Sequence, residues 1–477
     1  EFNLIDTPGH VDFSYEVSRS LAACEGALLL VDAAQGIQAQ TLANVYLAME
    51  RDLEIIPVVN KVDLGAAEPE AVADEIKQTF GFGDDDIIFA SGKDGTGISR
   101  ILDFVVAKVP PPKDNGSRPL RALIFDSKYD TYKGVVAYVR VFDGSVPEKG
   151  RIKVMDTGAT SEMLEVGFFS PEATRTNGLG TGQVGYIATG LKTIGDAPVG
   201  DTITMVGEHA MEPLETYVPL KPMVFAGLYP SDGEKYLDLR DALEKLRLND
   251  SAMQFQPEMS MALGSGFRCG FLGLLHMDVV QERLEREFGL SLLATSPGVA
   301  YRVIKADGTE IEIDNPSRLP DQSLISEIRE PWSKLTIVTP ANFMGQVIDL
   351  VTGRGGALEK TEYLQYGEMS PGASGIANRG RKKGPSATRV MLEMVLPLSE
   401  MLVDFYDQLK SRTQGYASMD YVVSEYRKGN LVRLDILVNG ETVDALSVVV
   451  HREGASEKGR ELASRLKELI PRQLFEV

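Results

Sequence analysis

The first 112 residues alternate short apolar runs with helical patterns, and this alternation restricts the fold more than any other feature of the sequence. Residues 27–31 and 55–59 are continuous apolar runs, which suit strands buried on both faces of a parallel sheet. Between them, Leu42, Val45 and Met49 recur at helical spacing. The pattern predicts a doubly wound α/β sheet.

Three further patterns follow a linker at residues 110–116, which begins with three prolines and cannot continue a helix. Residues 118–206 hold short β-rich runs separated by turns, which is typical of a small β-barrel. From Pro222 onward the pattern alternates between strands and helices, and a similar pattern returns after Pro331. We therefore expect two small α/β sandwiches of one kind. The apolar helix stripes are Tyr236, Leu239, Leu243 and Leu246; Met277, Val280, Leu284 and Phe288; and, in helices expected at 343–351 and 399–409, Leu402, Phe405 and Leu409.

The composition is that of an ordinary folded chain. A length of 477 residues suggests about three to five domains. Hydrophobic residues make up 43% and charged residues 25%, which argues against disordered and fibrous classes. The sequence has no apolar stretch of the roughly 18 to 20 residues that a membrane span needs, and its two cysteines form no zinc-binding pattern. We therefore expect a cytoplasmic protein.

Charge is distributed unevenly along the chain. The net charge of −20 argues against non-specific nucleic-acid binding, because affinity for phosphates comes from Lys and Arg. Residues 1–117 carry 8 basic and 20 acidic side chains, whereas residues 351–477 carry 18 and 17. The C-terminal end can therefore present a locally basic surface to RNA. Its most basic segment is a Gly-, Ser- and Pro-rich stretch at 367–386, which we interpret as a solvated loop that contains Arg379, Arg381, Lys382 and Lys383.

The first motif with a chemical meaning is Asp6-Thr7-Pro8-Gly9-His10, directly after a strand expected at residues 2–5. The Asp6 carboxylate can hold Mg²⁺ through water, and Gly9 lets its backbone N–H approach a terminal phosphate closely. His10 can orient the attacking water. The alternative is an ordinary turn, because Asp-Thr-Pro-Gly is also common turn chemistry.

The second motif, Asn60-Lys61-Val62-Asp63, follows the apolar run at 55–59, where a base-recognition loop belongs. The Asp63 carboxylate can accept hydrogen bonds from guanine N1–H and the 2-amino group together, which adenine does not offer. The aliphatic part of Lys61 can lie along the base, and Asn60 can tie neighbouring loops together. The alternative is a plain loop at the end of a strand.

A third segment, Ser91-Gly92-Lys93, follows an apolar run and can offer backbone N–H groups to the guanine carbonyl. Alone it is a weak signal, since such a tripeptide is usually just a loop. A phosphate-binding loop of the form G-x-x-x-x-G-K-[ST] does not occur in the 477 residues. Because the chain also begins with Glu1 rather than Met, we expect the printed sequence to be a fragment.

These motifs resemble the translational GTPases, and longer stretches narrow the resemblance to the elongation factor 4 (LepA-type) family. Residues 6–26 are similar to this family almost residue by residue. Residues 266–277 and 281–287 are more specific to elongation factor 4 than to its relatives, and residues 411–421 and 469–473 extend the similarity over essentially the whole chain.

The resemblance implies a multidomain α/β fold: part of a P-loop-type GTPase domain, a β-barrel, two ferredoxin-like α/β sandwiches and part of a C-terminal domain. It implies GTP or GDP and Mg²⁺ as cofactors, with Asp6, Gly9, His10, the 60–63 loop and the 91–93 loop as site residues. It also implies a monomer that binds the ribosome and tRNA, promotes back-translocation with GTP hydrolysis, and makes peripheral contact with the bacterial inner membrane. The corresponding domains are expected at 1–112, 118–206, 218–300, 329–428 and 430–477.

Two alternatives remain open at this stage. One is a non-catalytic ribosome-binding protein without a phosphate loop. The other is an elongation factor G-type translocase, which the linear order disfavours because little room is left for an additional domain between the two sandwiches.

We predict that a polypeptide of residues 1–477 alone binds GTP poorly and does not hydrolyse it measurably. The phosphate loop is the element that offsets the charge of the triphosphate with backbone N–H groups and a lysine. Titration calorimetry checks this expectation, and micromolar GTP affinity of this polypeptide would contradict it. Addition of a phosphate-loop segment before Glu1 is expected to restore both GTP binding and GTP hydrolysis. We call this extended chain the full-length protein.

Overall fold

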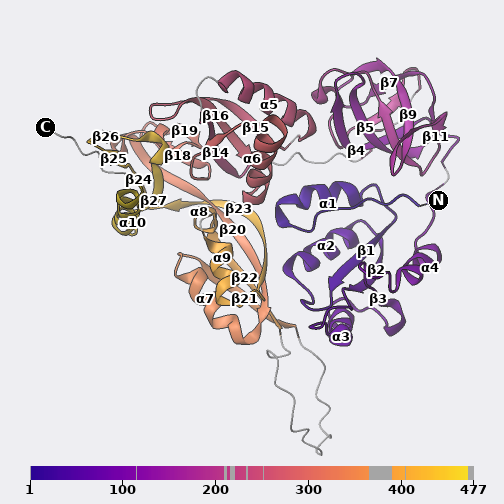
Figure 1. Ribbon diagram of the computed structural model, residues 1–477, viewed down its shortest axis with the longest axis horizontal. Coiled ribbons are helices and arrows are strands. Elements are labelled where there is room, and N and C mark those ends of the chain that lie inside the picture. The colour runs from indigo at the N-terminus through magenta and orange to yellow at the C-terminus, as the bar shows by residue number, and fades with distance from the viewer. Residues whose placement is uncertain are drawn as a thin grey trace, which may run out of the picture.

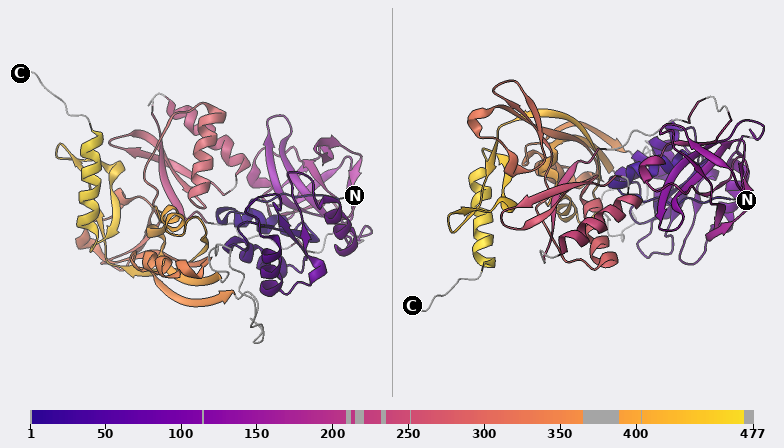
Figure 2. Two further views of the ribbon diagram at one scale, coloured as in Figure 1. Left: turned by 60° about the horizontal axis from the view of Figure 1, so that its bottom comes forward. Right: turned by 90° about the horizontal axis from the view of Figure 1, so that it is seen from above.

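The computed structural model describes residues 2–113, 115–208, 212–214, 221–231, 235–250, 252–364, 389–402 and 404–470 (Figure 1). It confirms the predicted multidomain α/β fold. The first parallel sheet and an antiparallel sheet lie at one end of the molecule, and the C-terminal helix lies at the other end in both views of Figure 2. In the described part of the chain, no helix is long and apolar enough to span a membrane.

The first sheet is parallel and has the order β1-β2-β3 among the described residues. Leu42 of the predicted stripe is buried against this sheet in one cluster with Val31 and Val59, and Val45 of the stripe is also buried. The elements are η1 (Val11–Phe13), α1 (Ser14–Leu21), β1 (Gly26–Asp32), α2 (Ala39–Glu50), β2 (Glu54–Asn60), α3 (Pro69–Phe80), η2 (Asp84–Asp86), β3 (Ile88–Phe89) and α4 (Ile98–Lys108).

Two expectations for this region are wrong. Residues 2–5 form no strand, and Phe2 and Leu4 are largely exposed. A short apolar run becomes a strand only where its backbone groups find a partner, and residues 2–9 pair with no strand in the described part of the sheet. Met49 is also exposed, because it lies in the last turn of α2 beyond the face that packs on the sheet.

The predicted β-barrel is an eight-stranded antiparallel sheet with the order β10-β9-β12-β5-β4-β13-β7-β8. The short strands β6 and β11 pair with each other beside this sheet. Strands along the whole sheet contribute buried side chains to one core, for example Val139, Ile152, Val166 and Ile203. The strands are β4 (Arg121–Asp130), β5 (Gly134–Asp143), β6 (Val146–Pro147), β7 (Arg151–Val154), β8 (Thr160–Glu162), β9 (Glu165–Ser170), β10 (Glu172–Arg175), β11 (Gly178–Leu179), β12 (Val184–Ala188) and β13 (Thr202–Met205), with a short η3 (Ile194–Asp196) before β13.

The first sandwich has the sheet order β15-β16-β14-β17, covered by two helices. The predicted stripes bury Leu239, Leu243, Val280 and Leu284 almost completely. The elements are β14 (Val224–Pro230), α5 (Tyr236–Asn249), β15 (Gln254–Ser260), β16 (Gly264–Phe271), α6 (Leu274–Phe288) and β17 (Leu292–Ala294).

The second sandwich repeats this arrangement, because β21, β22, β20 and β23 pair in the same relative order. Two additional strands, β18 and β19, join its sheet beside β20. The elements are β18 (Tyr301–Lys305), β19 (Glu310–Ile313), η5 (Pro316–Arg318), η6 (Gln322–Leu324), β20 (Ile325–Pro340), η7 (Ala341–Phe343), α7 (Met344–Thr352), β21 (Ala357–Leu364), β22 (Arg389–Pro397), α8 (Leu398–Met401), α9 (Phe405–Arg412) and β23 (Ser418–Gly429).

The helix expected at 399–409 is instead two short helices, α8 and α9. The chain breaks before Phe405 because Asp404 adopts a left-handed conformation with φ of 54°, which an α-helix does not accept. Leu402, Phe405 and Leu409 are nevertheless buried, as the stripe predicts. The basic residues Arg379, Arg381, Lys382 and Lys383 lie outside the described residues. The five domain boundaries stay predictions.

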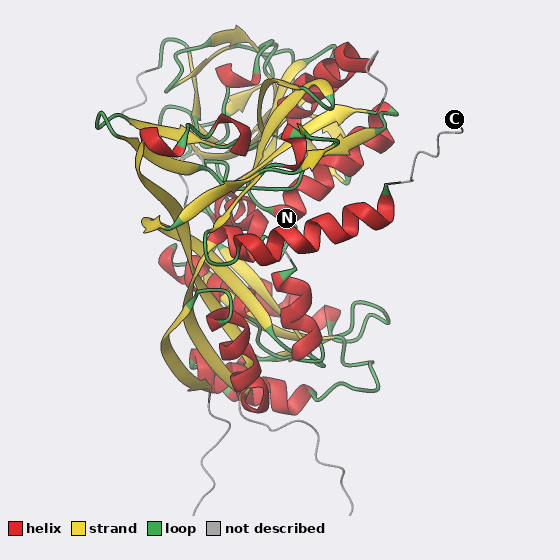
Figure 3. Cartoon of the chain, turned by 90° about the vertical axis from the view of Figure 1, so that its left-hand side faces the viewer, coloured by secondary structure: helices red, strands yellow, loops and turns green. Residues whose placement is uncertain are grey.

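The C-terminal region pairs β24 (Leu431–Leu434) with β27 (Val448–His451) and β25 (Leu437–Val438) with β26 (Glu441–Thr442); a short η8 (Asp444–Leu446) precedes β27. Its last described element is α10 (Ala455–Leu469), which has no fully buried side chain and lies on the outside of the molecule (Figure 3).

Polar contacts connect the first sheet to the second sandwich. The backbone N–H of Ala39, at the start of α2, donates to Ser418 Oγ at 2.8 Å. The side-chain amide of Gln40 donates to the carbonyl of Met419, also at 2.8 Å. Both acceptors lie in β23, so the start of α2 is anchored on that strand.

His276 and Asp250 connect the two helices of the first sandwich. His276 Nε2 lies 2.7 Å from Asp250 Oδ2, and His276 Nδ1 accepts from the backbone N–H of Leu272 at 3.0 Å. Burial alone raises the pKa of Asp250, but the hydrogen bond from His276 Nε2, with those from backbone N–H groups, outweighs burial and holds the pKa below its ordinary value.

We predict that Asp250→Asn lowers the unfolding free energy of this sandwich at pH 7 by about 1 to 3 kcal/mol, since a charged hydrogen-bond acceptor is lost. A pKa that is lower in the folded state means that ionised Asp250 favours folding. Its contribution is present above the unfolded pKa of about 4 and is lost as pH falls through the folded value. The difference in unfolding free energy between Asp250→Asn and the unmodified protein should therefore become smaller in acid.

Hydrogen-exchange protection of α6 between pH 3 and 7 measures this difference. Asp241→Asn is the matched control, because Asp241 lies on α5 in an exposed ion pair with Arg240. It should change protection little at any pH. A constant difference between Asp250→Asn and the unmodified protein across this pH range would contradict the assignment.

Candidate nucleotide-binding site

The candidate site lies at the carboxyl edge of the parallel sheet. In the register of β1 and β2, Asp32 is opposite Asn60, and Val59 is in turn opposite Phe89 of β3. The loops that leave these strands therefore begin at the same edge. In open α/β sheets this edge is where ligands bind.

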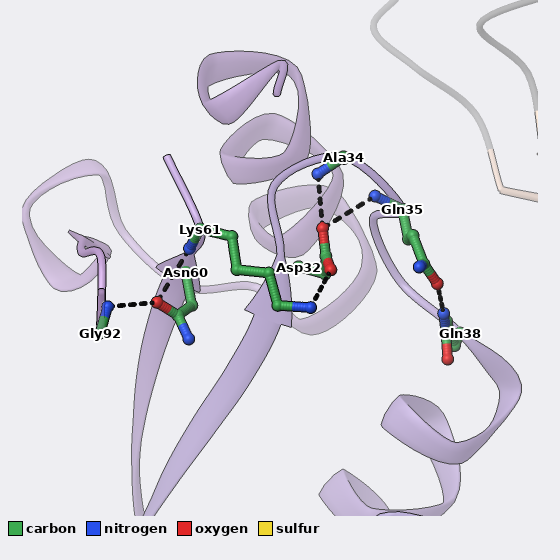
Figure 4. Close-up of polar contacts among 7 residues, drawn as sticks. All are labelled: Asp32, Ala34, Gln35, Gln38, Asn60, Lys61 and Gly92. Carbon is green, nitrogen blue, oxygen red and sulfur yellow. Dashed lines mark hydrogen bonds and ion pairs between the residues drawn. The ribbon is translucent and has the colours of Figure 1, made fainter. Parts of the chain in front are cut away.

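Asn60 ties two of these loops together. Its side-chain oxygen accepts from the backbone N–H of Lys61 at 2.8 Å and from that of Gly92 at 3.2 Å (Figure 4). The backbone adds a third link, because the N–H of Val62 donates to the carbonyl of Ala90 at 3.3 Å. The sequence predicted this tying role for Asn60, and the structure places the 60–63 and 91–93 loops side by side.

Asp63 is oriented by Ser91. The Ser91 hydroxyl is fully buried and donates to Asp63 Oδ1 at 2.8 Å. The same hydroxyl oxygen accepts from the backbone N–H of Lys93 at 3.3 Å. Asp63 itself is exposed, so one carboxylate oxygen is fixed by the protein while the group faces solvent. The side chain of Lys93 and the backbone of Gly92 are exposed beside it.

Lys61 is held by a residue that the sequence reasoning missed. Its ammonium lies 2.7 Å from Asp32 Oδ2, and its backbone is left-handed with φ of 64° (Figure 4). Asp32 Oδ1 accepts from the backbone N–H groups of Ala34 at 2.8 Å and Gln35 at 3.3 Å. These contacts fix the direction in which the Lys61 side chain runs.

The pKa of Asp32 reflects this environment. Burial raises it, but the hydrogen bond and charge of Lys61 and the two backbone N–H groups outweigh burial, so the pKa lies below its ordinary value. The signal in the sequence was available, because Asp32 ends an apolar run just as Asn60 does. The loop after β1 is closed by Gln38, which donates to the Gln35 side chain (Figure 4).

The motif at residues 6–10 lies apart from these contacts. Asp6 and Gly9 are exposed, and a Cβ added to Gly9 would meet no atom within 4 Å. His10 is partly exposed and its Nδ1 accepts from the backbone N–H of Asp12 at 3.3 Å. In the described part of the chain, no hydrogen bond or ion pair joins Asp6, Gly9 or His10 to the 60–63 or 91–93 loops.

The open surroundings of Asp6 fit a water-mediated Mg²⁺ contact. Its carboxylate has no hydrogen-bond partner in the described part of the chain, and oxygen is the ligand that Mg²⁺ prefers. The described residues hold no cluster of three or more His, Cys, Asp or Glu that could bind a metal alone. Asp6 therefore suits an ion whose other ligands come from water and phosphate.

Family models match three stretches of the chain. The elongation factor Tu GTP-binding domain matches residues 1–111, the elongation factor G C-terminus matches residues 376–437, and the C-terminus of the GTP-binding protein LepA matches residues 438–477. Together with the polar loops at the carboxyl edge of the parallel sheet, these matches define a translational GTPase.

Similar curated proteins give the particular family. Elongation factor 4 of Thermobifida fusca (strain YX) is 55% identical over 475 residues, covering 100% of this chain and 74% of the relative. Elongation factor 4 of Halalkalibacterium halodurans is 53% identical over 476 residues, covering 100% of this chain and 75% of the relative. The chain belongs to the elongation factor 4 family, which confirms the resemblance and favours it over the elongation factor G-type alternative.

A solved structure supports the fold alone. A crystal structure of a protein from Thermus thermophilus matches with a TM-score of 0.57 at 16% sequence identity, over 96% of this chain and 88% of that one. The domain arrangement is therefore shared with a chain of very different sequence.

Proposed function

We propose that Asn60, Lys61, Val62 and Asp63, with the Ser91-Gly92-Lys93 loop, recognise the guanine of GTP or GDP. The observation that carries this proposal is the hydrogen bond from buried Ser91 to Asp63, which orients an exposed carboxylate at the carboxyl edge of the sheet. A carboxylate held in this way can accept from two adjacent donors of a base. Guanine presents such a pair in N1–H and its 2-amino group, whereas adenine does not.

The remaining loop residues have matching roles. The aliphatic part of Lys61 lies along the base, with its ammonium kept in place by Asp32. The backbone N–H groups of Gly92 and Lys93 already donate to Asn60 Oδ1 and Ser91 Oγ, so a guanine carbonyl bound at this loop would share these donors with the protein. The bonds made by Asn60 keep both loops at a fixed separation, which base recognition requires.

The phosphate end of the site is assigned to Asp6, Gly9 and His10. Asp6 would hold Mg²⁺ through water, and the ion would supply positive charge that neutralises the phosphates. Gly9 has open space around its α-carbon, so its backbone N–H can approach a phosphate oxygen. His10 orients the water that attacks the terminal phosphate.

On this basis the full-length protein is a ribosome-dependent translation factor that promotes back-translocation of tRNAs on improperly translocated ribosomes, which supports the fidelity of translation. This assignment rests on membership of the elongation factor 4 family. We further propose a monomer in the cytoplasm that binds ribosomal RNA, ribosomal proteins and tRNA, with peripheral contact on the cytoplasmic side of the inner membrane. Copurification with ribosomes, rather than with membranes, would remove the membrane contact from this proposal.

For the full-length protein, we predict that His10→Ala leaves GTP affinity nearly unchanged but slows ribosome-stimulated turnover by roughly 10² to 10⁴-fold. That range is usual for loss of a group that handles a proton or orients water in the transition state. Single-turnover hydrolysis on ribosomes measures the effect. An unchanged rate would remove His10 from the mechanism.

We predict that Asp63→Asn moves the base preference of the full-length protein from guanine toward xanthine. The amide places an N–H₂ group opposite one of guanine's two donors, which costs on the order of 1 to 3 kcal/mol. Xanthine has an acceptor oxygen at C2, which the amide can donate to while its own oxygen still accepts from N1–H. Competition binding between GTP and XTP measures the change, and Asp52→Asn is a control on an exposed loop of the same sheet. An unchanged preference for GTP would mean that Asp63 does not read the base.

A further inference from the structure

Asp12, two residues after His10, makes contacts that the proposed chemistry does not explain. It is a nearly buried carboxylate, 7% exposed, in the short helix η1. Its Oδ2 accepts from the backbone N–H of Leu275 at 2.8 Å, and its Oδ1 accepts from the Tyr421 hydroxyl at 3.2 Å. Leu275 lies in α6 of the first sandwich and Tyr421 in β23 of the second, so one side chain touches both sandwiches.

The contact with α6 is an N-terminal cap supplied from 263 residues earlier in the chain. The residue in the N-cap position of α6 is Gly273, which has no side chain to cap the helix. A Cβ on Gly273 would lie 2.1 to 2.3 Å from the carboxylate atoms of Asp12, so the glycine is what admits this carboxylate. The carboxylate there also meets the positive end of the helix dipole.

The contact with Tyr421 is equally well defined. Burial raises the pKa of the Tyr421 phenol, and the nearby Asp12 carboxylate raises it further. The phenol therefore stays protonated at neutral pH and donates to Asp12. It gives the carboxylate a second partner in place of water.

The backbone of Asp12 meets His10. The N–H of Asp12 donates to His10 Nδ1 at 3.3 Å, which assigns the proton of the neutral ring to Nε2. The His10 ring also lies edge-on to Phe13, with the ring centroids 6.4 Å apart. The position of the ring therefore depends on where η1 is held, and the carboxylate of Asp12 holds η1 on α6 and β23.

We propose that Asp12 is a positioning residue that places His10 for GTP hydrolysis only while α6 and β23 are docked against η1. This inference rests on the proposed role of His10 in hydrolysis. The other polar contacts between the first sheet and the second sandwich do not share this property. Ser418 and Met419 bind the start of α2. Arg389 of β22 donates to the carbonyls of Gln35 and Ile37, in the loop before α2. These contacts hold a different element from the one that carries His10.

Kinetics of the full-length protein on ribosomes test the proposal. Asp12→Ala and Gly273→Ala should each lower the rate of hydrolysis at saturating GTP by roughly 10 to 10²-fold, with GTP affinity unchanged. Gly273→Ala displaces the carboxylate without altering Asp12. Asp12→Asn should stay within about threefold of the unmodified rate, because its amide oxygen still accepts from Leu275. Ser418→Ala is the control, since it removes a sheet–sandwich hydrogen bond remote from His10, and it should be as active as the unmodified protein.

Three outcomes of this experiment would contradict one of the two proposals. If His10→Ala slows hydrolysis but Asp12→Ala and Gly273→Ala do not, Asp12 has no positioning role, while the proposed function stands. An equal loss in Ser418→Ala would also overturn the inference, because general docking rather than Asp12 would then set the rate. If His10→Ala itself has no effect, the proposed role of His10 fails.

A spectroscopic measurement on residues 1–477 tests the placing of His10 without any hydrolysis. The sequence contains 4 histidines, so the ring ¹⁵N signals of a histidine-labelled sample can be assigned with single His variants. In the unmodified protein the His10 ring should show the Nε2–H tautomer. Asp12→Ala and Gly273→Ala should shift it toward a mixture of tautomers, whereas Ser418→Ala should not. Identical His10 signals in all four proteins would overturn the inference.

Discussion

The parallel pairing of β1 with β2 is the constraint on which the candidate site depends. Its register sets Asp32 opposite Asn60, so the last polar residue of each strand reaches the same edge of the sheet. The ion pair of Lys61 with Asp32 follows directly from that alignment. A shift of one residue would turn these side chains to the opposite face and separate the loops.

The two ends of the site are held by different means. The base end is fixed within the first sheet, by hydrogen bonds among loops that follow adjacent strands. The proposed phosphate end, around His10, adjoins Asp12, which is held by a helix and a strand more than 260 residues away in sequence. Under the proposed roles of these residues, nucleotide affinity and hydrolysis would respond separately to a change in the arrangement of the sandwiches.

The strands and loops could be predicted from the sequence where the local residue pattern alone determines the structure. Apolar runs gave β1 and β2, and their polar ends gave the 60–63 loop. It failed where the outcome depends on a partner strand, as at residues 2–5, and where a single residue breaks a helix, as at Asp404. The tie from Asp12 to α6 and β23 was also beyond reach, because no spacing rule joins segments so distant in the chain.

The two sandwiches share one continuous hydrophobic core, to which Leu243 and Val280 contribute from the first and Leu335 and Leu392 from the second. A close-packed core of this kind resists sliding between its halves. The two sandwiches are therefore expected to move as one rigid body, together with the C-terminal strands and α10. A displacement of α10 would then change the position of α6 and β23 relative to η1, because no hinge between the sandwiches takes up the motion.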